Sequence, residues 1–194
     1  MRICIDFDHV LVETSKAILK TYNDEFNDNI KYNKDHQWDL TGLIPDKYRK
    51  WVLDSFDSNE RIFRNMEPIK DSVEILKELS KEHRLVIVTQ HSGIGMYYKE
   101  KVIKELFPFC DIAFISGADK SVTCGDIFID DRPECLNSVK GNYKYIWCFG
   151  IYNWNKNWDG IRVNSWKEVK HKIDEIIWRN LKPSVYFFCT NNIY

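Results

Sequence analysis

The chain has 194 residues, 44% of them hydrophobic, and its 28 Lys and Arg residues nearly balance its 29 Asp and Glu residues. A chain of this length can bury a full core and suits one domain with an insertion. Its net charge of −1 gives no general attraction to nucleic acid, and no apolar run approaches the ~20 residues of a membrane span. We therefore expect neither an extended nucleic-acid surface nor a membrane partner.

The N-terminus and the cysteines favour a reduced, cytoplasmic setting. Strand-forming residues begin at Arg2, which leaves no room for a signal peptide. The six cysteines are scattered without a CxxC pair: Cys4, Cys110, Cys124, Cys135, Cys148 and Cys189. Several lie in apolar runs, so we expect reduced core thiols rather than disulfides or a zinc site.

A short apolar strand at residues 2–5 is followed by two acids, Asp6 and Asp8. Open α/β sheets bind ligands at the carboxyl ends of their strands. Two carboxylates held this close repel each other unless a cation, or a phosphate ligand in a metal complex, makes use of them. Acids at a strand end are also common turn residues and helix caps, so this pair alone is not specific.

From residue 67 onward, strands and helices alternate, which is typical of a parallel sheet with crossover helices. Pro68 opens a helical pattern that runs to Leu79, and an apolar strand then ends at Thr89. Gly93 and Gly95 break the chain before a helix at residues 96–106. Further strands are predicted at 111–116, 127–130 and 145–149, and the capping-box sequence 165–168 opens a last helix. Residues 185–189 fit either an edge strand or a packed tail.

The strand that ends at residue 130 carries a second acidic pair, Asp130 and Asp131. Lys120 lies ten positions before Asp130, in a loop. The ordered set is therefore a DxD motif, a strand-end threonine, a loop lysine and a strand-end acidic pair. Two strands that both end in acids predict one metal site built from distant parts of the chain.

This ordered set resembles the haloacid dehalogenase superfamily of phosphotransferases over residues 1–13 and 67–150. The resemblance implies an α/β fold, with a Rossmann-like parallel sheet, helices on both faces and a small helical cap inserted after the first strand. It divides the chain into a catalytic core (1–13 and 67–182), a cap (14–66) and a C-terminal tail (183–194). The cap carries many aromatic residues, most of which we expect to form its own core.

Within the superfamily, the sequences Asp130-Asp131-Arg132-Pro133 and Trp38-Asp39-Leu40 are similar to those of the 5'(3')-deoxyribonucleotidases. Two departures concern the ligand pocket: Gln90 follows the threonine where that group usually has a smaller residue, and His9 stands where glycine is common. We expect His9 to be a solvated loop residue. For His91, near Gln90, two alternatives stay open: it lines the pocket, or it is exposed, as a lone histidine in a loop more often is.

The resemblance gives each acid a role that fits phosphoryl transfer. Asp6 is the expected nucleophile, and Asp8 is the expected general acid and base. The expected cofactor is Mg²⁺, bound by the carboxylates of Asp6 and Asp131 and by the backbone carbonyl of Asp8. Asp130 would orient Lys120 without touching the metal, although the sequence allows Asp130 and Asp131 to exchange these roles.

We expect a Mg²⁺-dependent phosphomonoesterase that hydrolyses deoxyribonucleoside 5' or 3' monophosphates through an aspartyl-phosphate. The expected substrate- and phosphate-binding residues are Thr89, Gln90, Lys120, Arg132 and Trp38, with Trp38 stacking on the base. The alternatives are a phosphatase for another small phosphate ester or for a nucleic-acid 3' phosphate, and a phosphoacceptor or nucleotide-binding regulator. A homodimer is compatible with each of them.

Overall fold

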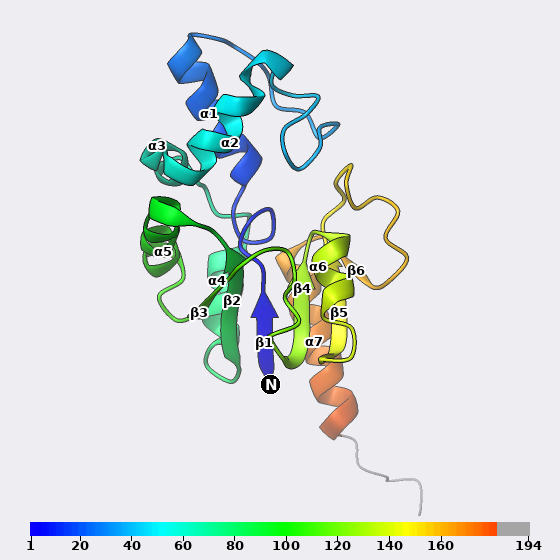
Figure 1. Cartoon of the computed structure of the whole chain (residues 1–194). Helices are drawn as coiled ribbons and strands as arrows, with labels where there is room; N and C mark the ends of the chain where they lie inside the picture. Colours follow the sequence, from blue (N-terminus) through cyan, green and yellow to red (C-terminus); the bar gives the residue numbers. More distant parts are fainter. Residues whose placement is uncertain (182–194) are drawn as a thin grey trace, which may run out of the picture.

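The computed structural model describes residues 1–181, and its centre is a six-stranded parallel sheet (Figure 1). The strand order is β3-β2-β1-β4-β5-β6, and every neighbouring pair is parallel. The strands are β1 (Arg2–Ile5), β2 (Arg84–Gln90), β3 (Asp111–Ile115), β4 (Gly125–Asp130), β5 (Tyr143–Phe149) and β6 (Arg162–Val163). Because β1 lies between β2 and β4, the carboxyl ends of these three strands meet at one edge of the sheet.

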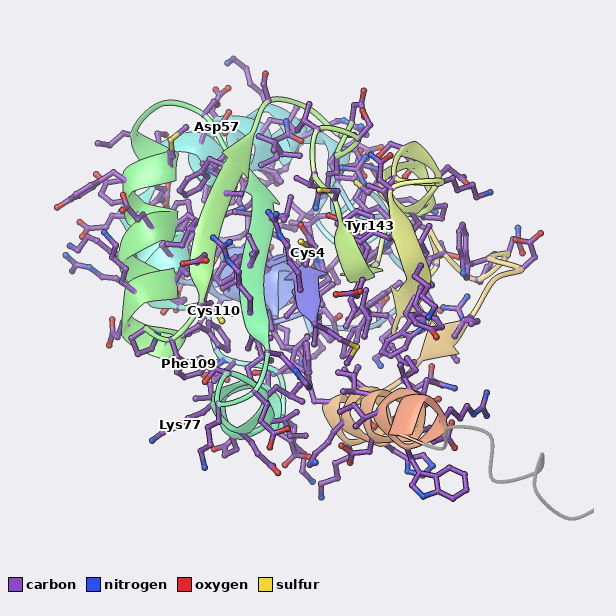
Figure 2. All side chains as sticks on the ribbon, turned by 90° about the horizontal axis from the view of Figure 1, so that it is seen from below. Cys4, Asp57, Lys77, Phe109, Cys110 and Tyr143 are labelled. Carbon is purple, nitrogen blue, oxygen red and sulfur yellow. The ribbon has the colours of Figure 1, made fainter. Side chains whose placement is uncertain are left out.

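Both faces of the sheet are buried. Successive side chains of a strand point to opposite faces, so β1 to β5 each contribute to two cores. Ile3 and Ile5 of β1 belong to the larger core, whereas Cys4 lies in a smaller one with Phe128 and Tyr143 (Figure 2). Strands that are covered on both faces form near-continuous apolar runs, which is why the sequence predicted them.

Within residues 1–181, four helices cover the sheet. The helices α4 (Ser72–Leu79), α5 (Gly93–Leu106) and α7 (Trp166–Leu181) contribute to the larger core, and α6 (Pro133–Ser138) contributes to the smaller one. α4 and α7 lie side by side along one face (Figure 2). The last helix predicted from the capping-box sequence is confirmed as α7, and its residues Trp166, Val169 and Ile173 are fully buried.

The segment between β1 and α4 forms a helical unit above the carboxyl edge of the sheet (Figure 1). Its elements are α1 (Thr14–Phe26), the 3-10 turn η1 (Asp46–Tyr48), α2 (Arg49–Ser58) and α3 (Glu60–Arg64). Four of its rings, those of Tyr22, Phe26, Tyr48 and Trp51, pack against one another with centroids 4.4 to 5.6 Å apart. Most of the aromatic side chains of this unit thus pack inside the protein.

The structure differs from the sequence prediction at two helix starts. The helix expected from Pro68 begins at Ser72. The helix expected from Met96 begins at Gly93, so that Gly95, expected to be a break, lies inside α5. A Cβ on Gly95 would lie 2.1 Å from the His91 ring and 2.7 Å from the carbonyl oxygen of Asp57, so glycine allows α5 to approach the helical unit.

Five cysteines lie within residues 1–181, and all five are free thiols. Cys4, Cys135 and Cys148 are buried, as expected of core thiols, whereas Cys110 is partly buried and Cys124 is exposed. Cys189 and the predicted edge strand or packed tail at 185–189 lie outside the described residues. None of the helices up to residue 181 is long and apolar enough to cross a membrane.

Candidate active site

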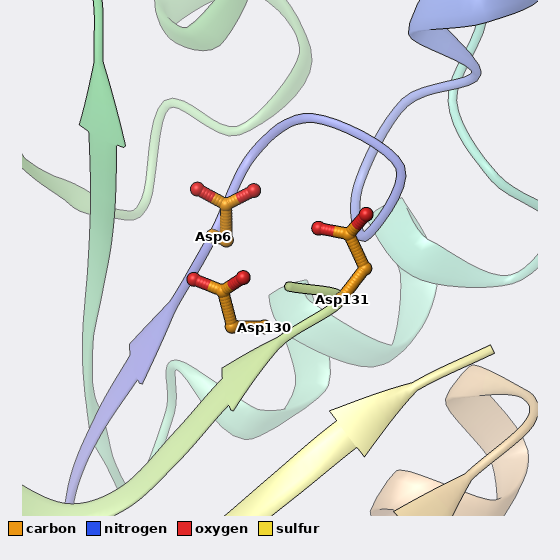
Figure 3. Close-up of side chains that lie close together, drawn as sticks. All are labelled: Asp6, Asp130 and Asp131. Atoms are coloured by element: carbon orange, nitrogen blue, oxygen red, sulfur yellow. The ribbon is translucent and has the colours of Figure 1, made fainter. Parts of the chain in front are cut away.

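Three carboxylates meet where β1 and β4 end. Asp6 follows β1, Asp130 is the last residue of β4, and Asp131 comes directly after it. One oxygen from each of these side chains lies within 4.8 Å of the others, and all three residues are buried (Figure 3). The adjacent parallel strands β1 and β4 therefore bring together acids that are more than 120 positions apart in sequence, as the sequence predicted.

Lys120 is the buried cation beside these acids. Its Nζ donates to Asp6 Oδ1 at 2.5 Å, to Asp130 Oδ2 at 2.7 Å and to the Val88 carbonyl oxygen at 2.9 Å. Burial alone would lower the pKa of Lys120, but the charges of Asp130 and Asp6 outweigh it and the pKa is raised. Lys120 is therefore a fixed positive charge in the site.

The geometry distinguishes the two acids of the second pair. Both oxygens of Asp130 already have partners, because Oδ1 accepts from the backbone N–H of Arg132 at 2.8 Å and Oδ2 from Lys120. Asp131 Oδ2 accepts from the indole N–H of Trp154 at 2.8 Å. Lys120 and the Arg132 N–H thus occupy both oxygens of Asp130, whereas the bond from Trp154 engages only one oxygen of Asp131, so Asp131 is better placed to bind a cation.

The site carries more buried negative charge than Lys120 can neutralise. Burial raises the pKa of Asp6 to about 7, and Lys120 acts in the opposite direction. The pKa of Asp131 is raised well above its ordinary value by burial and by the charges of Asp130 and Asp6. The available donors are hard carboxylate and carbonyl oxygens, which suit Mg²⁺ and would be relieved of their mutual repulsion by it.

Asp8 is held by two hydrogen bonds, and the sequence analysis predicted neither donor. Thr14 Oγ1 donates to Asp8 Oδ1 at 2.8 Å, and Lys99 Nζ donates to Oδ2 at 2.6 Å. Lys99 is fully buried, and it also bonds Thr89 Oγ1 at 3.2 Å and the Gln90 carbonyl oxygen at 3.0 Å. Burial alone would raise the pKa of Asp8, but Lys99 outweighs it and the pKa is lowered.

A helical pattern could have singled out Lys99. It lies four positions after Gly95 and four before Ile103, and these three residues form a buried stripe on α5. A lysine within an apolar stripe of a helix is unusual, because lysine is almost never fully buried unless it is paired.

The acids lie at the floor of a cavity of about 530 Å³, which is within the usual range for small-molecule sites. Among the expected binding residues, Gln90, Lys120, Arg132 and Trp38 line this cavity. Thr89, also expected to bind the phosphate, does not line the cavity: it is fully buried, and its hydroxyl accepts from Lys99. The ring of Trp38 is half exposed, and the Arg132 guanidinium lies 4.7 Å from its centroid.

The expectation that His9 is a solvated loop residue was wrong. His9 is buried, its Nε2 lies 2.7 Å from Ser15 Oγ, and burial lowers its pKa to about 4. Its backbone φ of 58° is in the left-handed region that glycine favours, which accounts for the glycine common at this position. The ring contacts Tyr152 and Trp154, which arrive from a loop more than 140 positions away.

Of the two alternatives for His91, the structure confirms that it lines the cavity and contradicts its exposure. His91 is buried between the rings of Phe56 and Phe63, and its Nε2 lies 3.1 Å from the Phe56 carbonyl oxygen. It therefore links the loop after β2 to the helical unit.

The parallel sheet, the acids at the ends of β1 and β4, the buried lysine and the helical insertion after β1 define a phosphatase of the haloacid dehalogenase class. A haloacid dehalogenase-like hydrolase from Streptococcus pneumoniae has the same fold, with a TM-score of 0.60 at 17% identity over 89% of this chain and 97% of that one. A HAD hydrolase from Bacillus subtilis, solved bound to magnesium, has a TM-score of 0.56 at 12% identity over 89% of this chain and 98% of that one.

The family model described as 5' nucleotidase, deoxy (pyrimidine), cytosolic type C protein matches residues 1–181, and the chain belongs to this family. The 5'(3')-deoxyribonucleotidase of Bacillus subtilis is 30% identical over 180 residues, which cover 88% of this chain and 97% of the relative. The chain is accordingly a phosphoric monoester hydrolase, and the resemblance seen in its sequence is confirmed. The alternative of a non-enzymatic regulator is set aside.

Proposed function

We propose that this enzyme hydrolyses deoxyribonucleoside 5' or 3' monophosphates in a Mg²⁺-dependent reaction that passes through an aspartyl-phosphate on Asp6. The observation that carries the proposal is the convergence of Asp6, Asp8, Asp131 and Lys120 at the floor of one cavity. The cavity is large enough for a nucleotide, and its rim holds the aromatic ring of Trp38. The name of the Bacillus subtilis relative supports the same substrate class.

The proposed metal ligands are the carboxylates of Asp6 and Asp131 and the backbone carbonyl of Asp8. Asp130 is the less suitable ligand, because Lys120 and the Arg132 N–H already occupy its two oxygens. When bound, Mg²⁺ would neutralise charge on the phosphate oxygens and bring the phosphorus within reach of the nucleophile.

The residues of the chain account for both half-reactions. A carboxylate oxygen of Asp6 attacks the phosphorus, the ester P–O bond breaks, and the leaving oxygen takes a proton from Asp8. In the second half-reaction, Asp8 takes a proton from a water that attacks the phosphoaspartate, which releases inorganic phosphate and restores Asp6. Lys120 stabilises the negative charge of the phosphoryl group throughout.

Substrate selection is assigned to the rim of the cavity. Trp38 would stack on the base, while Arg132 and Gln90 contribute to holding the phosphate and sugar. Thr89 does not line the cavity, and its hydroxyl would act through Lys99, to which it is bonded. We propose that residues 14–66 act as a cap that keeps bulk water away from the phosphoaspartate.

A phosphatase screen tests the proposal. The purified enzyme is assayed with deoxyribonucleoside 5' and 3' monophosphates, ribonucleotides and sugar phosphates, each in Mg²⁺ and in EDTA. We expect the highest kcat/KM with deoxyribonucleotides and no turnover in EDTA. A clear preference for a sugar phosphate would favour the alternative of another small phosphate ester and would overturn the nucleotide assignment.

A further inference from the structure

Two consecutive residues of the loop after β5 bond the side chain and the backbone of Asp131. The indole N–H of Trp154 donates to Asp131 Oδ2 at 2.8 Å, and Asn155 Nδ2 donates to the Asp131 carbonyl oxygen at 2.9 Å. Asn155 is fully buried, and its Oδ1 accepts from the backbone N–H of Tyr152 at 2.9 Å. The loop therefore fixes both the backbone and the side chain of this acid.

The plane of the Trp154 ring is fixed in turn by its neighbours. The ring is stacked on Tyr152, with centroids 4.6 Å apart and planes 2° apart, and the His9 ring meets it edge-on at 5.1 Å. The Tyr152 hydroxyl donates to the His9 carbonyl oxygen at 2.8 Å. The contacts with Tyr152 and with His9, which belongs to the loop after β1, thus keep the indole N–H directed toward Asp131.

This arrangement leaves one oxygen of Asp131 for a cation. Figure 3 shows one carboxylate oxygen of Asp131 directed toward Asp6 and the other directed away. An indole can only donate, so its bond restricts rotation of the Asp131 carboxylate. This restriction prepares the orientation of Asp131 as a ligand before the metal arrives.

We propose that Trp154 is a positioning residue for the metal site, which sets the affinity of the enzyme for Mg²⁺ through its hydrogen bond to Asp131. The inference rests on the proposed magnesium site. Hydrogen-bond partners of metal ligands are commonly worth about 10–100-fold in metal affinity. Trp154 itself contacts neither the metal nor the substrate in this role.

Trp154→Phe is the variant that tests this role, because it keeps an aromatic ring for stacking on Tyr152 and removes the N–H donor. Mg²⁺ binding to the substrate-free protein is measured by calorimetric titration. We expect Kd to rise about tenfold or more. The Mg²⁺ concentration that gives half-maximal turnover should rise by a similar factor, whereas kcat at saturating Mg²⁺ should change little.

Trp158→Phe is the matched control. The indole of Trp158 belongs to the same loop, but it donates to the Ile161 carbonyl oxygen at 3.3 Å. Its loss should leave Mg²⁺ affinity unchanged. Trp154→Leu also lacks the donor, so it should weaken Mg²⁺ binding as much as Trp154→Phe does. Melting curves in EDTA show which of the two variants keeps the native fold and can be used for the titration.

The outcomes separate this inference from the proposed function. Wild-type affinity in folded Trp154→Phe or Trp154→Leu would overturn the role of Trp154 and leave the metal site intact. An equal loss in Trp158→Phe would also overturn it, since the effect would then belong to the loop as a whole. Absence of Mg²⁺ binding in the wild-type protein would overturn the metal site and this role together.

Discussion

The ammonium group of Lys99 lies 2.6 Å from Asp8 Oδ2, and it joins the expected general acid to a helix 91 positions further along the chain. The lysine side chain is fully buried, whereas that of Asp8 is 23% exposed. Lys99 also bonds the Thr89 hydroxyl, so a single cation orients two groups of the site. The rings of Phe7 and Phe56 also lie near this ammonium group, with centroids 5.6 and 5.5 Å from Nζ.

Replacing Lys99 with methionine should reduce both stability and turnover. Breaking a buried ion pair by removing one partner typically costs about 3–5 kcal/mol, and the partial exposure of Asp8 places the expected loss at the lower end. Without its partner the Asp8 carboxylate is also free to rotate away from the leaving oxygen. General acid–base catalysis contributes at least ~10²-fold to the rate, and we expect kcat to fall by up to this factor. Urea unfolding and steady-state kinetics measure the two effects.

The control for this change is Lys101→Met, two positions along the same helix. Lys101 is exposed and lies 3.8 Å from Glu60. Exposed ion pairs contribute roughly 0–1 kcal/mol, so stability and kcat should stay close to wild type. If Lys99→Met kept wild-type kcat, Lys99 would have no part in orienting Asp8.

Stabilisation of the protein by Mg²⁺ should depend on pH in a direction set by the acids. The pKa of Asp6 is about 7 and that of Asp131 is also raised, so both must lose protons before they bind a cation. A carboxyl group whose pKa is raised on folding stabilises the folded protein at low pH. This stabilisation is lost as the pH rises through the pKa that the group has in the folded protein. In EDTA, Asp6 and Asp131 should therefore weaken the fold between about pH 4 and 7.

His9 opposes this trend over part of the same range, because its lowered pKa of about 4 gives stability that is lost as the pH falls below the ordinary histidine value. The informative quantity is therefore the difference in Tm between Mg²⁺ and EDTA at each pH. This difference should be small at pH 5 and increase through pH 7. If the difference in Tm did not change with pH, the cation would bind elsewhere.

Ca²⁺ should also bind at this site and stabilise the protein. Because its coordination is looser than that of Mg²⁺, it should nevertheless inhibit turnover.

The strands and their acids could be predicted from sequence because their signals are local. An apolar run that ends in Asp6, or in Asp130 and Asp131, is visible within ten residues, and parallel pairing then brings the ends together. The two-residue strand β6 was missed, since no periodicity can be read from two residues.

The buried histidines and the indole bonded to Asp131 could not be predicted in this way. His9 is buried by Tyr152 and Trp154, and His91 by Phe56 and Phe63. Each of these contacts joins segments that are far apart in sequence and is formed by tertiary packing. A loop position in the sequence therefore says little about the exposure of its side chain.

Trp38→Ala should separate recognition of the base from the chemistry. If Trp38 stacks on a base, kcat/KM for a deoxyribonucleotide should fall by the equivalent of roughly 1–3 kcal/mol, the usual loss per stacked base. Turnover of p-nitrophenyl phosphate, which has no base, should change little. Trp38→Phe retains a ring and should recover much of the nucleotide activity. If kcat/KM fell equally on both substrates, Trp38 would instead have a structural role in the helical unit formed by residues 14–66.

Asparagine substitutions should separate the two acids of the opening motif. Asp6→Asn removes the nucleophile, because an amide is a poor attacking group, and should abolish both turnover and acid-stable labelling of the enzyme by phosphate. Asp8→Asn keeps the backbone carbonyl, so Mg²⁺ binding should survive while protonation of the leaving group fails. Its defect should shrink with p-nitrophenyl phosphate, since p-nitrophenolate leaves without a proton.

Rapid-quench measurement of phosphoenzyme formation on p-nitrophenyl phosphate distinguishes the two roles. Asp8→Asn should form the phosphoaspartate at a substantial rate and then accumulate it, because the attacking water also needs Asp8 as its base. Asp6→Asn should form none. The roles would be reversed if Asp6→Asn still became labelled while Asp8→Asn did not, and Lys99 would then hold the nucleophile rather than the general acid.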